Sequence, residues 1–541
     1  MQKKFIGWVL FGLIFISEII AGYYVWHIKG FVFGDGISRV ANAFYVLYIQ
    51  PPHLAAIGMV WNPLPSFMEL PLLLLWPIYK PIASSGLAGV IMTSAFAAAS
   101  GVIIYRYTVK FGSSHFVGIA LALLYCFNPF MFIFGFSGLS ESPFNFILLW
   151  LIFNYTEWLE SEEPSNIVQM AIALGLGFLI RYEIIPIAGC LFLGVVFIVL
   201  MIHRANLASE YRKDLRYSFE RAEGTAIILL TPIVYACLIW ILYNWIITGN
   251  PLYFLNSVYS NLGCKDFYAA NEVLASMIGN PGKIVSYILL CTKYFLIPAV
   301  IIIGYRVIKL KVFQWDFLSL VLLMSSTLAL QFYMLGNGTS IGAFRYYSFP
   351  FVILCAWLPF EMKKFNSKLF TFLCLISLIV SDIALGYAWF QKQEFKNNKV
   401  LFEAADLKFE CSPKEIAQRD VAQYINIHIP NAKILMDSYR TYNVILNVNQ
   451  PSNLIVTCSY EFNQAIRNPR KYKVDYLLVP SETNDFSRQD ALNRLYPTLY
   501  QQGAFWCTPV KEFSGYYKLF KIVQKVEYPQ ITTDAGKKLK Q

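Results

Sequence analysis

Apolar residues in this chain come in long runs separated by short polar stretches. Most runs are close to 20 residues long, and a helix of that length crosses the roughly 30 Å of hydrocarbon in a bilayer. The pattern therefore predicts an α-helical polytopic membrane protein with about eleven transmembrane helices. The predicted spans are residues 5–28, 86–107, 116–136, 142–159, 166–182, 184–203, 224–246, 284–306, 316–335, 346–361 and 368–390.

One further apolar stretch, residues 66–82, differs from these runs. Three prolines interrupt it, and it contains Glu69 and Lys80. Proline inside a helix removes a hydrogen bond and bends or breaks the helix. We therefore expect this stretch to lie in the outer membrane interface, within a first outer loop of residues 29–85, rather than to form another span.

The composition excludes a soluble globular protein. Hydrophobic residues make up 57% of the chain and charged residues only 14%, whereas soluble domains carry roughly a quarter charged residues. Lysine and arginine gather beside the first span and in the stretches 204–221, 306–311 and 363–368. Basic residues beside spans mark the cytoplasmic side. We therefore expect a multi-pass protein of the cytoplasmic (plasma) membrane with a cytoplasmic N-terminus, whose net charge of +11 reflects topology and not nucleic-acid binding.

The pattern changes after the predicted transmembrane domain, residues 1–391. Charged residues become frequent, and short runs rich in Val, Ile, Leu and Tyr alternate with helix-like stretches. This alternation is typical of a small α/β domain, which we place at residues 392–528 on the extracytoplasmic side. The helix-like stretches and strand-length runs of this domain are expected at 413–428, 433–436, 453–458, 460–467, 474–479, 487–502 and 517–523. The basic end, residues 529–541, is predicted to be a disordered tail.

Charged residues sit at the predicted outer ends of several spans. Asp35 lies in a Gly-Asp-Gly sequence, and Arg39 follows four residues later, on the same face if the segment is helical. The other groups are Glu141 in GLSESP, Arg181 and Glu183 in RYE, and Arg345 followed by Tyr346 in FRYY.

These residue types suit a reaction on a lipid-linked phosphate. Arginine donates paired hydrogen bonds to phosphate, and a carboxylate can accept a proton or hold a divalent cation. Each residue also has an ordinary structural explanation: Asp35 as a turn former, Glu141 as an acid at a helix N-terminus, and the arginines as interfacial anchors. The agreement of four groups at one membrane face favours a functional site.

The same segments resemble a known family. Asp35 is followed by the proline-rich stretches Pro51-Pro52-His53 and Trp61-Asn62-Pro63-Leu64-Pro65, and Glu141 stands at the turn before the fourth span. This order resembles the polytopic C-type (GT-C) membrane glycosyltransferases, in particular the protein O-mannosyltransferase and lipid A aminoarabinose transferase group, over residues 30 to 390. Many relatives have Asp-Glu where this chain has Asp35-Gly36.

The resemblance implies a glycosyltransferase whose donor is a polyprenyl-phosphate-linked sugar. The acceptor would be a hydroxyl of a lipid, a protein or an envelope polymer, and transfer on the outer face would invert the anomeric carbon. Asp35 and Glu141 would be the catalytic carboxylates, with Asp35 as the base. Glu141 would either hold a divalent metal ion, with Asp35 as the other ligand, or orient an arginine. The residues expected to bind substrate are Arg39, His53, Trp61, Arg181, Glu183, Arg345 and Tyr346.

Two other classes of function stay open at this point. A transporter or flippase for a lipid-linked or small polar substrate would carry charges near the bilayer midplane, and Glu18 and Asp382 do lie within predicted spans. A scaffold whose C-terminal domain binds an envelope partner would need no charged residues at the outer face. Replacing Asp35 separates an enzyme from a scaffold.

Overall fold

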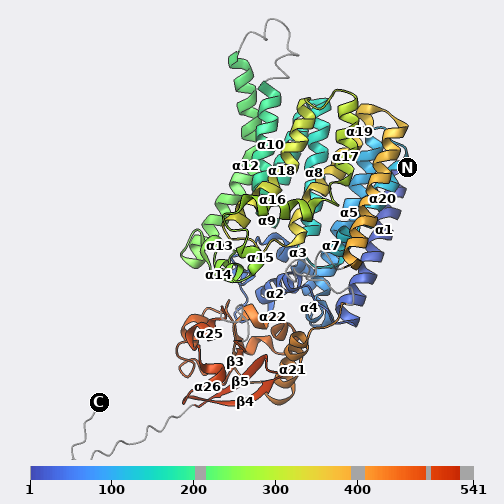
Figure 1. Ribbon diagram of the computed structural model, residues 1–541. Coiled ribbons are helices and arrows are strands. Elements are labelled where there is room, and N and C mark those ends of the chain that lie inside the picture. Colours follow the sequence, from blue (N-terminus) through green and yellow to red (C-terminus); the bar gives the residue numbers. More distant parts are fainter. Residues whose placement is uncertain (1, 201–214, 392–408, 483–488, 524–541) are drawn as a thin grey trace, which may run out of the picture. The chain divides into compact units, whose positions relative to one another are not determined.

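The computed structural model describes residues 2–200, 215–391, 409–482 and 489–523. Contacts divide the chain into two compact units (Figure 1). One comprises residues 1–47 and 52–412, and the other comprises residues 48–51 and 413–541. The predicted boundary near residue 391 falls beside residues 392–408, which lie outside the described residues, as does the predicted tail at 529–541.

The first unit is helical. Its elements are α1 (Gln2–Gly22), the π-helix η1 (Tyr23–Ile28), α2 (Gly34–Tyr48), the 3-10 helix η2 (Leu54–Ile57), α3 (Leu64–Leu73), α4 (Pro81–Ser84), α5 (Leu87–Lys110), α6 (His115–Cys126), α7 (Pro129–Phe136), α8 (Glu141–Ser161), α9 (Pro164–Ile180), α10 (Ile184–Ile198), α12 (Leu215–Thr248), α13 (Tyr253–Asn256), α14 (Lys265–Ala269), α15 (Glu272–Ala275), α16 (Pro281–Thr292), α17 (Ile297–Ile308), α18 (Trp315–Gly336), the 3-10 helix η4 (Phe344–Tyr347), α19 (Phe349–Phe365) and α20 (Lys368–Gln391).

Five helices among the described residues are long and apolar enough to cross a membrane. They correspond to α1 with η1, α5, α12, α18 and α20. Two further pairs qualify only as bent spans, α6 with α7 at 70° and α16 with α17 at 97°. The protein is thus a polytopic membrane protein with five to seven candidate spans by this measure. The other predicted spans coincide with α8, α9, α10 and α19, which are helical but shorter or more polar.

The stretch predicted to lie in the interface is not a span by length. Within residues 66–82, α3 ends at Leu73 and is followed by turns and by the short α4. Pro71 lies inside α3. The ten residues of α3 would cover only about 15 Å.

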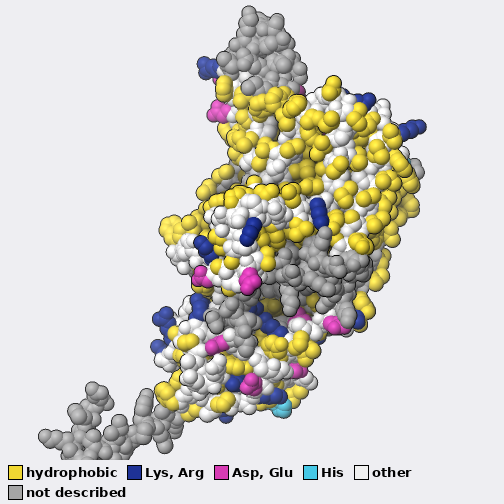
Figure 2. Space-filling view, in the orientation of Figure 1, with side chains coloured by type: hydrophobic (Ala, Val, Ile, Leu, Met, Phe, Trp, Pro, Cys, Tyr) yellow, Lys and Arg dark blue, Asp and Glu magenta, His cyan; other side chains and the backbone are white. Residues whose placement is uncertain are grey.

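Helix α5 packs against α1, α6, α7 and α8. Small residues allow this close approach: a Cβ on Gly101 would lie 2.4 Å from Ile14 Cδ1 and 3.0 Å from Cys126 Sγ. The face of the helical unit seen in Figure 2 is largely hydrophobic. Exposed apolar side chains of this unit include Trp8, Ile16 and Leu238. Such a surface suits contact with lipid.

The second unit contains a mixed five-stranded sheet in the order β2-β1-β3-β5-β4. Strand β1 pairs in parallel with β2 and β3, whereas β5 pairs antiparallel with β3 and β4. Its elements are α21 (Pro413–His428), β1 (Ile434–Leu435), α22 (Ser438–Asn447), η5 (Pro451–Asn453), β2 (Leu454–Ile455), α23 (Phe462–Ala465), β3 (Tyr476–Pro480), α25 (Ala491–Leu495), α26 (Leu499–Gln502), β4 (Cys507–Phe513) and β5 (Tyr517–Ile522).

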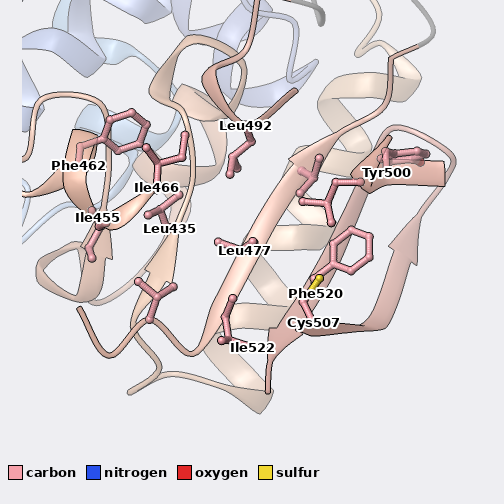
Figure 3. Close-up of a cluster of buried hydrophobic side chains, with 14 residues drawn as sticks. Leu435, Ile455, Phe462, Ile466, Leu477, Leu492, Tyr500, Cys507, Phe520 and Ile522 are labelled. Carbon is pink, nitrogen blue, oxygen red and sulfur yellow. The ribbon is translucent and has the colours of Figure 1, made fainter. Parts of the chain in front are cut away.

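The predicted α/β character of this region is present, because a helix and strands occur where the pattern indicated them. The side chains of Leu435, Leu477 and Phe520, from three different strands, belong to one buried cluster (Figure 3). The pattern missed α22 and β4. Strand β4 is an edge strand whose five central residues are exposed, so it lacks the apolar alternation that marks a half-buried strand.

Candidate functional site

The position of Asp35 depends on a close backbone contact. Asp35 lies in the first turn of α2, and the next residue, Gly36, faces the turn that precedes α8. A Cβ on Gly36 would lie 2.4 Å from the carbonyl oxygen of Ser137, so a side chain fits there only if the backbone moves. Gly36 therefore lets the start of α2 approach the turn before Glu141. This packing is a physical reason for glycine at position 36.

Glu141 is the first residue of α8 and is completely buried. Its Oε1 lies 2.8 Å from Arg181 Nη1 and 3.4 Å from Arg345 Nε. The positive end of the α8 dipole also favours an acid at this position. Glu141 therefore joins two arginines that are far apart in the sequence.

The two arginines each hold a second carboxylate. Arg181, which follows α9 in extended conformation, pairs with Glu183. Arg345, in η4, pairs with Asp35, 310 residues away in the chain. The result is a continuous series of ion pairs, Asp35–Arg345–Glu141–Arg181–Glu183.

Arg39 stands apart from this series. It follows Asp35 by one helical turn and is only 8% exposed. Its Nη2 donates to Ser140 Oγ at 3.2 Å, its Nη1 donates to the Asn62 carbonyl at 3.4 Å, and its guanidinium lies over the Trp61 ring at 5.1 Å. Among the described residues no carboxylate forms an ion pair with Arg39, and its Nε has no hydrogen-bond partner. We call Asp35, Arg39, Glu141, Arg181, Glu183 and Arg345 the charged cluster.

Tyr346 lies beside the cluster, with Arg181 and Arg345 at 5.6 and 5.4 Å from its ring centre. The guanidiniums therefore have an aromatic neighbour as well as carboxylates. His53 lies before η2, half-buried, and its carbonyl accepts from the Ala56 N–H. Its predicted role in substrate binding stays a prediction.

The arginines set the ionisation of the acids. Burial would raise the pKa of Asp35, but the charges of Arg345, Arg39 and Arg181 outweigh it and place this pKa below its usual value. Burial opposes ionisation of Glu183 as well, and Arg181 again brings the pKa below the usual range. Asp35 keeps 38% of its side chain exposed. It is therefore an ionised carboxylate that solvent or substrate can reach.

Glu69 in α3 is a neighbour that the sequence did not single out for chemistry. Its side chain is completely buried, and neither carboxyl oxygen has a hydrogen-bond partner within the described part of the chain. Burial raises its pKa well above the usual range, and Arg39 only partly opposes this effect. The feature of the sequence that could have pointed to Glu69 is the presence of an acidic residue within the apolar stretch 66–82.

The predicted divalent metal ion fits this arrangement poorly. Asp35 and Glu141 are both paired with guanidiniums, and Arg39 adds a further positive charge nearby. The described residues contain no group of three or more His, Cys, Asp or Glu side chains placed to hold a metal ion. We therefore derive no step through a metal. The arrangement suits an anion that can compete with the carboxylates for the arginines.

Comparisons with known proteins establish the fold. No family model and no curated protein sequence matches this chain. Among solved structures, ArnT from Cupriavidus metallidurans bound to undecaprenyl phosphate matches with a TM-score of 0.51 and 10% identity, over 95% of this chain and 98% of that one.

An oligosaccharyltransferase from Archaeoglobus fulgidus also matches, with a TM-score of 0.38 and 11% identity, over 87% of this chain and 69% of that one. ArnT is a lipid A aminoarabinose transferase. The resemblance seen in the sequence is thereby confirmed at the level of architecture: the chain has the fold of a GT-C membrane glycosyltransferase.

Proposed function

We propose that this protein transfers a sugar from a polyprenyl-phosphate-linked donor to an acceptor hydroxyl. The observation that carries the proposal is the charged cluster, where three arginines meet around an ionised, partly exposed aspartate. Arginine is the residue best suited to hold a phosphate through two hydrogen bonds. A fold match to a protein bound to undecaprenyl phosphate supports the same donor class.

In the proposed reaction the acceptor oxygen attacks the anomeric carbon from the side opposite the phosphate. A new carbon–oxygen bond forms, the bond to the phosphate oxygen breaks, and polyprenyl phosphate leaves with the electron pair. Asp35 takes the proton of the acceptor hydroxyl as general base. Arg345 and Arg181 stabilise the negative charge that grows on the phosphate. Displacement from the opposite face inverts the anomeric carbon.

The ion pair between Asp35 and Arg345 gives donor binding a second consequence. A phosphate that binds Arg345 competes with Asp35 for the same guanidinium. Once released, Asp35 loses the nearest charge that lowers its pKa and becomes a stronger base. Donor binding would thus prepare the base for the acceptor.

The proposal includes an orientation. Positive-inside bias places the 204–221 stretch in the cytoplasm and the charged cluster and the sheet-containing unit outside. Transfer would then take place on the outer face of the cytoplasmic membrane, onto a lipid, a protein or an envelope polymer. Cysteine labelling at residues 413–523 tests this orientation, and labelling only after the membrane is permeabilised would contradict it.

The decisive experiment compares envelope glycans of cells with and without the gene by mass spectrometry. A sugar missing from the deletion strain should return with the wild-type gene and with Asp266→Asn, which makes the same change at an exposed aspartate in α14. It should not return with Asp35→Asn at equal protein abundance. Full return with Asp35→Asn would remove the proposed base.

A transporter remains the second candidate because of two acids inside spans. Glu18 in α1 is completely buried, and its carboxyl oxygens have no hydrogen-bond partner in the described residues. Asp382 in α20 accepts from Asn128 Nδ2 at 2.6 Å. Intramembrane acids often mark ion pathways. Substrate uptake by vesicles that is lost in Glu18→Gln but kept in Asp35→Asn would favour transport.

A further inference from the structure

Ser140 connects the two parts of the charged cluster through one hydroxyl group. Its Oγ accepts from Arg39 Nη2 at 3.2 Å and from Arg181 Nη1 at 3.1 Å. The residue is only 2% exposed. Two guanidiniums, one from α2 and one from the segment that follows α9, are therefore fixed on a single buried oxygen atom.

The shared hydrogen-bond acceptor holds two positively charged guanidiniums close together against their mutual repulsion. Burial, followed by the charge of Arg181, lowers the pKa of Arg39, which reflects the cost of placing a second cation here. Arg181 is compensated by Glu141 and Glu183. Within the described residues no carboxylate forms an ion pair with Arg39, although the charges of Asp35, Glu141 and Glu69 act on it in that order. Arg39 is therefore compensated less directly than Arg181, which has two carboxylates in ion-pair contact.

The hydroxyl of Ser140 does not serve the helix that follows. Ser140 stands at the N-cap of α8, where serine usually accepts a hydrogen bond from a backbone N–H, yet its side chain makes no cap hydrogen bond. By contrast, Ser114 at the N-cap of α6 accepts from Val117 N. Helix stability alone thus does not explain the side chain of Ser140.

We infer that Ser140 is a positioning residue that holds Arg39 and Arg181 as a pair for the phosphate of the donor. Two guanidiniums fixed side by side offer a phosphate several donors without the entropy loss of ordering two long side chains at binding. The inference rests on the proposed function and adds a residue to it. It predicts a defect in binding the phosphate more than in the chemical step.

The test uses the purified full-length protein in detergent and undecaprenyl phosphate without sugar as the probe. Ser140→Ala should weaken binding by about tenfold, the effect of one hydrogen bond to a charged group. Ser140→Thr keeps the hydroxyl and should bind within about threefold of wild type by the same reasoning. With a sugar donor, Ser140→Ala should raise KM by a similar factor and leave kcat within about threefold.

Ser142→Ala is the matched control. Ser142 lies two residues away, is 4% exposed, and its hydroxyl donates to the Thr93 carbonyl at 2.7 Å, away from the arginines. Its loss should leave phosphate binding unchanged. If Ser140→Ala is not recovered folded, Ser140→Cys keeps the volume but offers only a weak acceptor and should show the same loss of binding.

The outcomes distinguish a failure of the positioning role of Ser140 from a failure of the proposed function. Ser140→Ala binding as tightly as wild type would overturn the positioning role, and so would equal losses in Ser140→Ala and Ser142→Ala. Wild-type protein that binds no undecaprenyl phosphate would instead overturn the proposed function. Weak binding confined to Ser140→Ala and Ser140→Cys would support both.

Discussion

Among the described residues of the helical unit, buried arginines and carboxylates form one group at each end of α19. The charged cluster includes Arg345 just before α19, and a second group surrounds Glu361 near its other end. In the second group Arg306 lies between Asp316 and Glu361, with Nη2–oxygen distances of 2.9 and 2.5 Å. We call Arg306, Asp316, Glu361 and Lys364 the Arg306 network.

The two groups differ in how completely their polar atoms are bonded. Arg306 is fully buried, and its remaining donors reach the Lys311 carbonyl and Gln314. Trp357 and Lys364 donate to Glu361 and Asp316. In the charged cluster, by contrast, the Nε atoms of Arg39 and Arg181 have no hydrogen-bond partner in the described structure.

The difference separates a structural role from a binding role. The Arg306 network joins α17, α18 and α19 through residues within about 60 positions of one another. Its groups already have their partners, as buried polar groups normally do. The charged cluster collects residues from distant segments and leaves donors available, which is the state expected of a site before its ligand arrives. Substitutions in the charged cluster should therefore act on binding and transfer, whereas substitutions in the Arg306 network should act on stability.

The largest expected effect is on catalysis. Asp35→Asn should lower transfer by about 100- to 10,000-fold, the usual contribution of a general base. The same change should tighten binding of undecaprenyl phosphate, because Arg345 no longer pairs with a carboxylate. Measuring the transfer rate and the affinity for undecaprenyl phosphate on the same preparation checks both expectations. Turnover within threefold of wild type would exclude Asp35 as base.

A change in the Arg306 network should act on stability instead. Glu361→Gln leaves Arg306 buried with one carboxylate fewer, and breaking a buried ion pair costs about 3–5 kcal/mol. Thermal unfolding in detergent should show a clear fall in Tm, while the KM for donor stays near wild type. If Glu361→Gln instead raised the KM for donor without lowering Tm, the Arg306 network would not be purely structural.

Arg345→Lys should have an intermediate effect. Lysine keeps the charge but loses the planar fork that meets two phosphate oxygens. The loss of one charge-assisted hydrogen bond, about 1.5–3 kcal/mol, predicts a fall in turnover of at least about tenfold. Donor titrations measure it, and unchanged donor use would leave Arg345 only a structural role in its ion pairs with Asp35 and Glu141.

The smallest effect is expected at Glu69. Its pKa is raised in the folded protein by burial, so folding favours the neutral acid, and Glu69→Gln should leave transfer within about threefold of wild type. A raised carboxyl pKa gives stability that is present below the unfolded pKa of about 4.3 and is lost as pH rises through the folded pKa. Tm measured against pH should therefore fall less at high pH in Glu69→Gln than in wild type. Equal pH profiles would mean that Glu69 is ionised at neutral pH.

Local patterns in the sequence were sufficient to predict a helical polytopic membrane protein. Long apolar runs need a helix to satisfy their backbone groups in lipid, so helices occur at each predicted span among the described residues. The helix at 413–428 and most strands of the sheet also follow from their own side chains. The exposed edge strand β4 was missed because it carries no clear local pattern. Helix α22 was missed although it buries Val444, Ile445 and Leu446.

The sequence also named the charged residues that come together, since Asp35, Arg39, Glu141, Arg181, Glu183 and Arg345 are costly to place near a membrane without a purpose. Which carboxylate meets which arginine was decided by tertiary structure alone. Asp35 pairs with Arg345, which lies 310 positions away in the chain. The shared hydroxyl of Ser140 and the burial of Glu69 were equally invisible, because partners and solvent exposure are set by distant segments whereas hydrophobic periodicity is local.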